Sequence, residues 1–252
     1  MRYFIDLSYN GANFHGWQIQ PNATTVQSVL NDCLSVLLKK DINCVGAGRT
    51  DTGVHAKQMI AHFDYDKIFN IDDLIFKLNA FLPKDIAIRS IKKVKSDAHA
   101  RFDAVKRTYL YKITTFKNVF EIDKSFYLKN QLDLELMNKA CSIMMTYSDF
   151  ESFSRKNSDV KTFKCHISEA IWTQNSDDIK FKISSDRFLR NMVRAIVGTM
   201  IEVGTNKISL NKFEEIIQSK NRSMAGASAP SEGLYLTQIQ YLKSIYQDVK
   251  SK

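Results

Sequence analysis

Proline is scarce in this sequence, with three among 252 residues, and no stretch is rich in serine, glycine and proline. Long flexible linkers have such compositions, so any junction between domains should be compact. The length suits one large domain or two smaller ones, each with its own core. A hydrophobic content of 44% and a charged content of 25% are those of an ordinary globular protein.

Long apolar runs are also missing. The stretch "MVRAIVGTMIEVG" is interrupted by Arg194 and Glu202, well short of the ~20 apolar residues that a membrane span requires. Near the N-terminus, Asp6 breaks the run "MRYFIDL" before the core of a signal peptide could form. We therefore expect a cytoplasmic protein with no membrane contact.

Several motifs of metal and cofactor chemistry are absent from the sequence. The five histidines do not fall at ligand spacing, and no Walker loop, G-x-G-x-x-G or G-x-S-x-G pattern occurs. We therefore expect no metal and no cofactor. The cysteines form no C-x-x-C pair and are expected to be reduced and buried; they are Cys33, Cys44, Cys141 and Cys165.

Negative charge is under-represented, since 27 Asp and Glu face 36 Lys and Arg, for a formal net charge of +9. A basic surface that only keeps the protein in solution is one interpretation. The other is a polyanionic partner, because phosphate neutralisation supplies much of the affinity of proteins for nucleic acids. Charge alone favours neither.

Hydrophobic periodicity predicts the order β-α-loop-β-α-β for the first hundred residues. Thr24 and Gln27 have the spacing of a capping box, and the helix that follows is expected to bury Val26, Val29, Leu30, Cys33 and Leu37. The predicted strands are "RYFIDLSY", "KQMIAHFDY" and "DIAIRSIKKV", and the second helix runs from Asn70 to a stop at Pro83.

In the second half, the sequence predicts a strand in which Tyr109, Tyr111 and Ile113 alternate with Leu110 and Lys112. A helix, a hairpin, two further helices and a closing strand follow; their segments are 132–145, 166–174 with 178–184, 188–204, 209–220 and 233–242. The economical architecture is α+β, with one subdomain over residues 1–105 and another over 106–252.

The loop "VGAGRTDTGVHA", residues 45–56, concentrates glycine, Arg49 and Asp51 at one bend. The ordinary explanation of this pattern is a turn in which glycine supplies the positive φ and the Asp51 side chain forms a hydrogen bond with its own backbone. A cation two residues earlier would also keep the Asp51 carboxylate ionised, and an ionised carboxylate on a bend is a ready nucleophile.

Two further groups of cations stand out. Arg101, Lys106 and Arg107 are interleaved with Tyr109 and Tyr111, either to guard an exposed edge strand or to hold phosphates beside a ring that stacks on a base; the sequence leaves both open.

Arg190 and Arg194 lie four residues apart on a predicted apolar helix. Charges at this spacing usually face solvent. Near a buried carboxylate, Arg194 would instead be its counter-ion.

Five blocks of this sequence resemble the tRNA pseudouridine synthase A family in order and spacing, from nearly one end of the chain to the other. They are "FHGWQIQPNATTVQSVL", "GAGRTDTGVHA", "ARFDAVKRTYLYKI", "FLRNMVRAIVGTMIEVG" and "ASAPSEGLYL". The resemblance implies that Asp51 is the catalytic nucleophile and that Tyr109 stacks on the target base. It further implies that Arg194 pairs with the catalytic carboxylate and that Arg49 holds the flipped nucleotide and its phosphate. For Arg190 it implies only a general RNA contact.

The resemblance also implies a fold and an activity. The fold is the pseudouridine synthase fold, with two α+β subdomains whose mostly antiparallel sheets flank a basic active-site cleft. The activity is the isomerisation of uridine to pseudouridine in the anticodon stem-loop of tRNA, by a homodimer in which one tRNA contacts both subunits. Such a reaction needs no redox partner and no hydrolysis, and the target base must leave its stack before a carboxylate can reach it.

Two alternatives belong to other classes. A non-catalytic RNA-binding protein or tRNA folding aid would keep the basic residues and lose Asp51, which is present here. A magnesium-dependent nuclease would need carboxylates such as Asp51, Asp64 and Asp66 in one cluster, and their spacing does not favour one.

Overall fold

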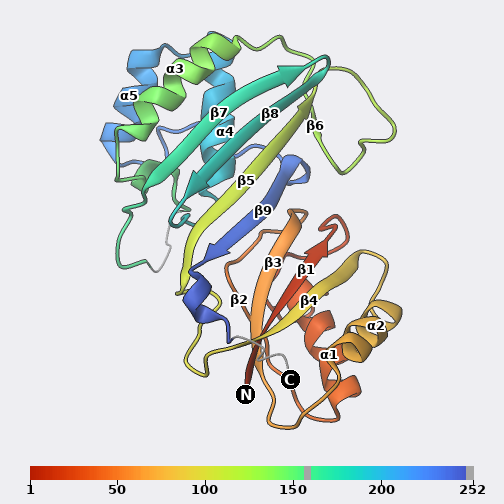
Figure 1. Ribbon diagram of the computed structural model, residues 1–252. Coiled ribbons are helices and arrows are strands. Elements are labelled where there is room, and N and C mark those ends of the chain that lie inside the picture. Colours follow the sequence, from red (N-terminus) through yellow and green to blue (C-terminus); the bar gives the residue numbers. More distant parts are fainter. Residues whose placement is uncertain (156–159, 248–252) are drawn as a thin grey trace. The chain divides into compact units, whose positions relative to one another are not determined.

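The computed structural model of the chain (Figure 1) describes residues 1–155 and 160–247. By its internal contacts the chain divides into two compact units. The first unit is Met1–Val105 with Leu236–Lys252, and the second is Lys106–Tyr235. Both units combine helices with strands that pair mostly antiparallel, as the α+β prediction expects.

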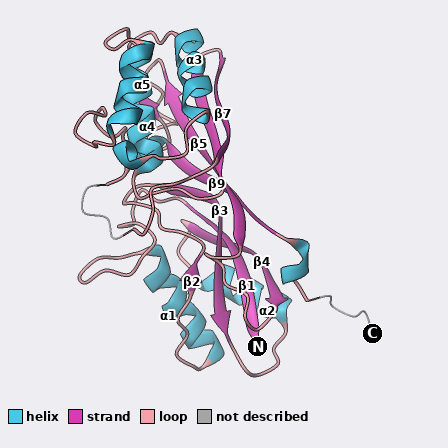
Figure 2. Cartoon of the chain, turned by 90° about the vertical axis from the view of Figure 1, so that its left-hand side faces the viewer, coloured by secondary structure: helices cyan, strands magenta, loops and turns pink. Residues whose placement is uncertain are grey.

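The first unit is built on strands β1 (Arg2–Tyr9), β3 (His55–Asp64) and β4 (Ile86–Val94), with β1 antiparallel to both others. The two-residue strand β2 (Val45–Gly46) pairs with β3. Helices α1 (Val26–Leu38) and α2 (Ile71–Phe81) pack on each other, and α2 packs on β4. Figure 2 shows α1 on one side of these strands. The predicted order of strands and helices is confirmed.

Helix α1 begins one residue later than its predicted capping box. Its N-cap is Thr25, which has extended backbone angles and exchanges hydrogen bonds with Ser28, so the box is Thr25 with Ser28. Gln27 instead donates from Nε2 to the Cys44 carbonyl at 2.7 Å. The buried side of the helix contains Leu34 and Leu38, whereas the expected Val29 and Leu37 are only partly buried; the complete buried set is Val26, Leu30, Asn31, Cys33, Leu34 and Leu38.

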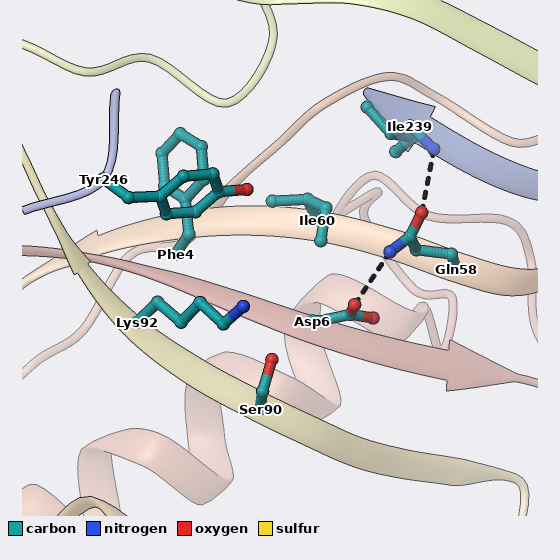
Figure 3. Close-up of a pocket in the computed structure, with 8 residues that line it drawn as sticks. All are labelled: Phe4, Asp6, Gln58, Ile60, Ser90, Lys92, Ile239 and Tyr246. Atoms are coloured by element: carbon teal, nitrogen blue, oxygen red, sulfur yellow. Dashed lines mark hydrogen bonds between the residues drawn. The ribbon is translucent and has the colours of Figure 1, made fainter. Parts of the chain in front are cut away.

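The last part of the chain, which the sequence analysis placed in the second subdomain, packs in the first unit. Strand β9 (Leu234–Tyr241) lies next to β3, where Gln58 joins two strands: its Oε1 accepts from the Ile239 N–H at 2.8 Å, and its Nε2 donates to Asp6 at 2.8 Å (Figure 3). The rings of Tyr241 and Tyr246 cover Phe4, which explains why Phe4 is buried although it alternates with the helix-facing residues of β1.

The second unit has β5 (Ala104–Thr114) antiparallel to β8 (Asp178–Ser185), and β8 antiparallel to β7 (Ile167–Asn175), while the short β6 (Phe126–Tyr127) runs parallel to β5. The predicted hairpin is β7 with β8. Helices α3 (Leu134–Met145), α4 (Met192–Gly204) and α5 (Leu210–Ser219) pack together on one side of these strands, as Figures 1 and 2 show. Single 3-10 turns occur at Glu151–Phe153, Ser231–Gly233 and Lys243–Ile245, the last in the first unit.

Helix α4 begins at Met192 and not at the predicted Phe188. The residue before it, Asn191, has a φ of 66°, which lies in the left-handed region and ends any helical path from the preceding residues. Arg190 therefore lies in a turn, and the expectation that Arg190 and Arg194 sit one helical turn apart is wrong. The apolar periodicity misled because Leu189 is buried like a helix residue although it precedes the helix.

All four cysteines are free and buried, as predicted. Within residues 1–155 and 160–247, none of the helices combines the length and the apolar composition needed to cross a membrane.

Candidate active site

Asp51 lies in the loop that connects β2 to β3, and its side chain is partly buried. The loop turns sharply after Asp51: the Val54 N–H donates to the Asp51 carbonyl at 3.2 Å, and Gly53 has a φ of 77°. A positive φ at this point is the reason for glycine in the T-D-T-G sequence. The turn that the ordinary explanation predicts is therefore present, and backbone atoms close it.

The segment between β1 and α1 packs against this loop and forms backbone hydrogen bonds with it. The Trp17 N–H donates to the Thr50 carbonyl at 3.1 Å, and the Gly53 N–H donates to the Phe14 carbonyl at 3.3 Å. Gly16, with a φ of 84°, lies so close that a Cβ there would strike the Thr50 carbonyl oxygen. This close approach means that the position of Asp51 depends on residues some 35 positions earlier in the chain.

Side chains add two buried contacts around the loop. The hydroxyls of Tyr9 and Thr50 share a hydrogen bond of 2.8 Å, with 4% and 7% of these residues exposed. His55, the first residue of β3, accepts at Nδ1 from the Gly11 N–H at 3.0 Å. Arg49 is exposed on the same loop. Arg49 and Asp51 thus lie together on one rigidly attached loop.

Tyr109 lies on β5 in the second unit, opposite Ile183 of β8. Only 9% of it is exposed, and its ring packs edge to face against Phe188 with 5.0 Å between the centroids. Of the neighbouring cations, Arg101 is exposed and Lys106 partly so, while Arg107 donates from Nη1 to the Asp186 carbonyl at 2.8 Å.

Arg194 lies in the first turn of α4 and is partly buried. Its Nε donates to the Ala229 carbonyl at 2.7 Å, and the Ala229 N–H donates back to the Arg194 carbonyl at 2.9 Å. Nearby, Asn191 donates to the Ser228 hydroxyl at 2.6 Å, and a Cβ at Gly198 would strike the Ala227 carbonyl. The guanidinium therefore binds the segment that precedes β9. Its neighbour Tyr111 is buried, and this burial raises the pKa of the Tyr111 phenol.

The nuclease alternative receives no support from the carboxylates it needs. Asp64 forms an ion pair with Arg2 at 2.7 Å, and Asp66 forms one with Lys40 at 3.3 Å. The Arg2 guanidinium lowers the pKa of Asp64 through its hydrogen bonds. In the described part of the chain, no three His, Cys, Asp or Glu side chains gather where they could hold a metal ion.

A sequence model of tRNA pseudouridine synthases matches residues 7–103 and 147–242, which is more than half of the chain. The chain belongs to the tRNA pseudouridine synthase family. A tRNA pseudouridine synthase A of Parabacteroides distasonis is 50% identical over 248 residues, covering 97% of this chain and 98% of that protein. One of Bacteroides fragilis is 49% identical over 248 residues, covering 98% of each, and one of Bacillus pumilus is 36% identical over 245 residues, covering 96% and 99%.

The two matched ranges include Arg49, Asp51 and Arg194, whereas Tyr109 lies between them. The mixed α and β content and the mostly antiparallel strands confirm the predicted pseudouridine synthase fold. Sequence reasoning assigned no role to Tyr9, Gly16, Trp17 or Phe188. The block "FHGW" contains Gly16 and Trp17 and was the available signal for these two, because glycine is the residue that permits a close approach of backbone.

Proposed function

We propose that this protein isomerises uridine to pseudouridine in the anticodon stem-loop of tRNA, with Asp51 as the nucleophile. The observation that carries the proposal is the loop of Arg49, Thr50 and Asp51, held at its backbone and lying within the residues that match the family. The excess of basic residues, +9 in net charge, suits a polyanionic substrate. Since tRNA is modified in the cytoplasm, we propose that compartment as its location.

The reaction breaks the glycosidic bond between the ribose and a base nitrogen and forms a bond from the same ribose carbon to a base carbon. Atoms and electrons balance within the nucleotide, so no oxidant, reductant or hydrolytic water is required. The Asp51 carboxylate acts on the ribose or on the base and leaves unchanged at the end, as covalent or proton-transfer catalysis requires.

Three other side chains take substrate-binding roles in this proposal. Tyr109 stacks on the flipped base, and its packing against Phe188 fixes the plane of its ring. Arg194 is the partner of the Asp51 carboxylate, as the family resemblance implies. Arg49, exposed beside Asp51, holds the phosphate of the flipped nucleotide. Arg190 contributes a general contact to RNA.

The test is incubation of the purified protein with an unmodified tRNA transcript, followed by mapping of pseudouridine. We expect pseudouridine in the anticodon stem-loop without any added metal or cofactor. A protein that binds the transcript and accelerates its folding without forming pseudouridine would instead be a tRNA folding aid, and the enzymatic proposal would be wrong.

We also propose that the protein acts as a homodimer and that one tRNA contacts both subunits, as the family resemblance implies. Sedimentation equilibrium at micromolar concentration tests the first part, with a mass near twice 29.0 kDa expected. A mass of one chain, unchanged when tRNA is added, would contradict it.

A further inference from the structure

The residue before the proposed nucleophile is anchored through both its backbone and its side chain. Thr50 is held through its carbonyl by the Trp17 N–H and through its side chain by the Tyr9 hydroxyl. Asp51, one peptide further along, is partly buried and begins the turn. Thr50 therefore fixes the start of the peptide that carries Asp51.

Tyr9 itself is fixed from three sides. It ends β1, where it pairs with Ala56 of β3 and Ile86 of β4. Its ring lies nearly parallel to that of Trp17, with the centroids 6.3 Å apart, and Trp17 in turn packs against Gly46, where a Cβ would strike the indole. The position of the Tyr9 hydroxyl is thus fixed by strand pairing and by the packing of its ring.

We infer that the hydrogen bond between the Tyr9 and Thr50 hydroxyls positions the Asp51 carboxylate for reaction. The two hydroxyls are engaged with each other, and only 4% and 7% of the residues are exposed, so in this inference they act as positioning residues and not as catalytic ones. This inference rests on the proposed role of Asp51. Its physical reason is that a reacting group misplaced by about 1 Å can lose on the order of 100-fold in rate, while binding of the rest of the substrate is unchanged.

The matching variants are Tyr9→Phe and Thr50→Val, which each remove one hydroxyl and keep the shape of the side chain. Thr50→Ser keeps the hydroxyl and serves as the conservative rescue. Tyr65→Phe is the control in the same unit, because the Tyr65 hydroxyl is likewise buried and donates to the Leu38 carbonyl at 3.0 Å, away from the Asp51 loop.

We expect kcat to fall about 10- to 100-fold in Tyr9→Phe and in Thr50→Val, with KM and the Kd for tRNA unchanged. The double variant should be no slower than the slower single variant, because both changes remove the same bond. Thr50→Ser should retain the parent kcat within about threefold, and Tyr65→Phe should lose stability without a change in kcat.

Three outcomes would overturn the inference: a kcat for Tyr9→Phe equal to that of Tyr65→Phe, losses confined to KM, or Thr50→Ser as slow as Thr50→Val. If Tyr9→Phe does not fold, the pair Thr50→Val and Thr50→Ser decides. An active Asp51→Asn protein would refute the proposed function itself. An inactive Asp51→Asn beside a fully active Tyr9→Phe would refute the positioning role alone.

Discussion

Both units have a proposed functional residue beside a close backbone contact made at a glycine, but the residue lies on a different side of that contact in each unit. In each, an irregular segment is pressed against its neighbour at a glycine that leaves no room for a Cβ: Gly16 against Thr50, and Gly198 against Ala227. In the first unit the functional residue, Asp51, lies on the held loop. In the second, Arg194 lies on the helix and its side chain does the holding.

This difference determines whether replacing the functional residue also breaks the bonds that hold its segment in place. Backbone hydrogen bonds close the Asp51 turn, so a change of the Asp51 side chain leaves those bonds in place. The Arg194 guanidinium donates to Ala229 directly, so any change of that side chain also releases the segment before β9. A residue with two tasks is expected to fail in both assays when it is replaced.

The largest combined effect is therefore expected for Arg194→Met. It should lower pseudouridine formation by about 100-fold or more and lower the free energy of unfolding by about 2 kcal/mol, because a charge-assisted hydrogen bond to Ala229 is lost. Arg190→Met is the matched control, since Arg190 is exposed before the helix; its stability should change by about 0.5 kcal/mol or less. Urea unfolding and a turnover assay check both. Equal stabilities of the two variants would break the comparison.

Gly16→Ala comes next and tests how the Asp51 loop is held. A side chain at a φ of 84° against the Thr50 carbonyl should cost on the order of 2–4 kcal/mol of unfolding free energy, and activity should fall as the loop shifts. Gly48→Ala, on the loop itself, is the control, because a Cβ there meets nothing within 4 Å. Its stability should stay within about 1 kcal/mol. Thermal melts that rank the two variants the other way would contradict this account.

Acid should weaken the first unit through His62. This buried histidine accepts a hydrogen bond at Nδ1 from the Ala100 N–H at 3.1 Å, and its ring lies 4.7 Å from that of His99. Burial lowers the pKa of His62 most, and the charges of Arg2 and His99 lower it further. The carboxylates of Asp64 and Asp103 raise it by less, so the pKa is about 4.

Because the folded pKa of His62 lies below the ordinary 6.5, the unfolded chain binds more protons between these values. Neutral His62 therefore makes its full contribution to the free energy of unfolding above pH 6.5. This contribution, on the order of 2 kcal/mol, is lost as the pH falls towards 4. His62→Asn, whose amide oxygen can replace Nδ1 as the acceptor, should show a smaller decrease between pH 7 and 4.5 in urea unfolding. An equal decrease in the two proteins would assign the effect to other groups.

The smallest effect is expected for single cations of the proposed RNA surface. Lys106→Gln should reduce the slope of log Kd for tRNA against log salt by about one unit and leave kcat unchanged. Arg107 is the less suitable choice, because its guanidinium also donates to the Asp186 carbonyl. Filter binding at several salt concentrations measures the slope, and an unchanged slope would place the RNA contact elsewhere.

Most of the secondary structure could be predicted because it is locally encoded. The alternating residues of β1 and the cap of α2, where the Asn70 side chain accepts from the Asp73 N–H, carry their signals within a few positions. The start of α4 could not be predicted, since the left-handed Asn191 interrupts an apolar periodicity that continues on both sides of it. The grouping of β9 with the first unit depends on contacts between residues far apart in the sequence, such as the one between Gln58 and Ile239, which are 181 residues apart.

The candidate site divides in the same way. Asp51 and Arg49 could be found because three glycines, a cation and a carboxylate in one bend are unusual for this glycine-poor chain. The bond between Tyr9 and Thr50 could not, because the two residues are 41 positions apart and meet only through the pairing of β1 with β3. The roles of Tyr109 and Arg194 came from family resemblance and remain predictions.

The most direct test of the nucleophile is a single-turnover assay of Asp51→Asn on an unmodified tRNA transcript, with Asp32→Asn on the exposed side of α1 as the control. Asparagine keeps the size of the side chain and the backbone bonds of the turn, and replaces one oxygen of the negatively charged carboxylate with a neutral NH2 group. The account predicts no pseudouridine from Asp51→Asn, undiminished tRNA binding, an unfolding free energy within about 1 kcal/mol of the parent, and full activity from Asp32→Asn. Pseudouridine formation by Asp51→Asn at more than a few per cent of the parent rate would contradict it.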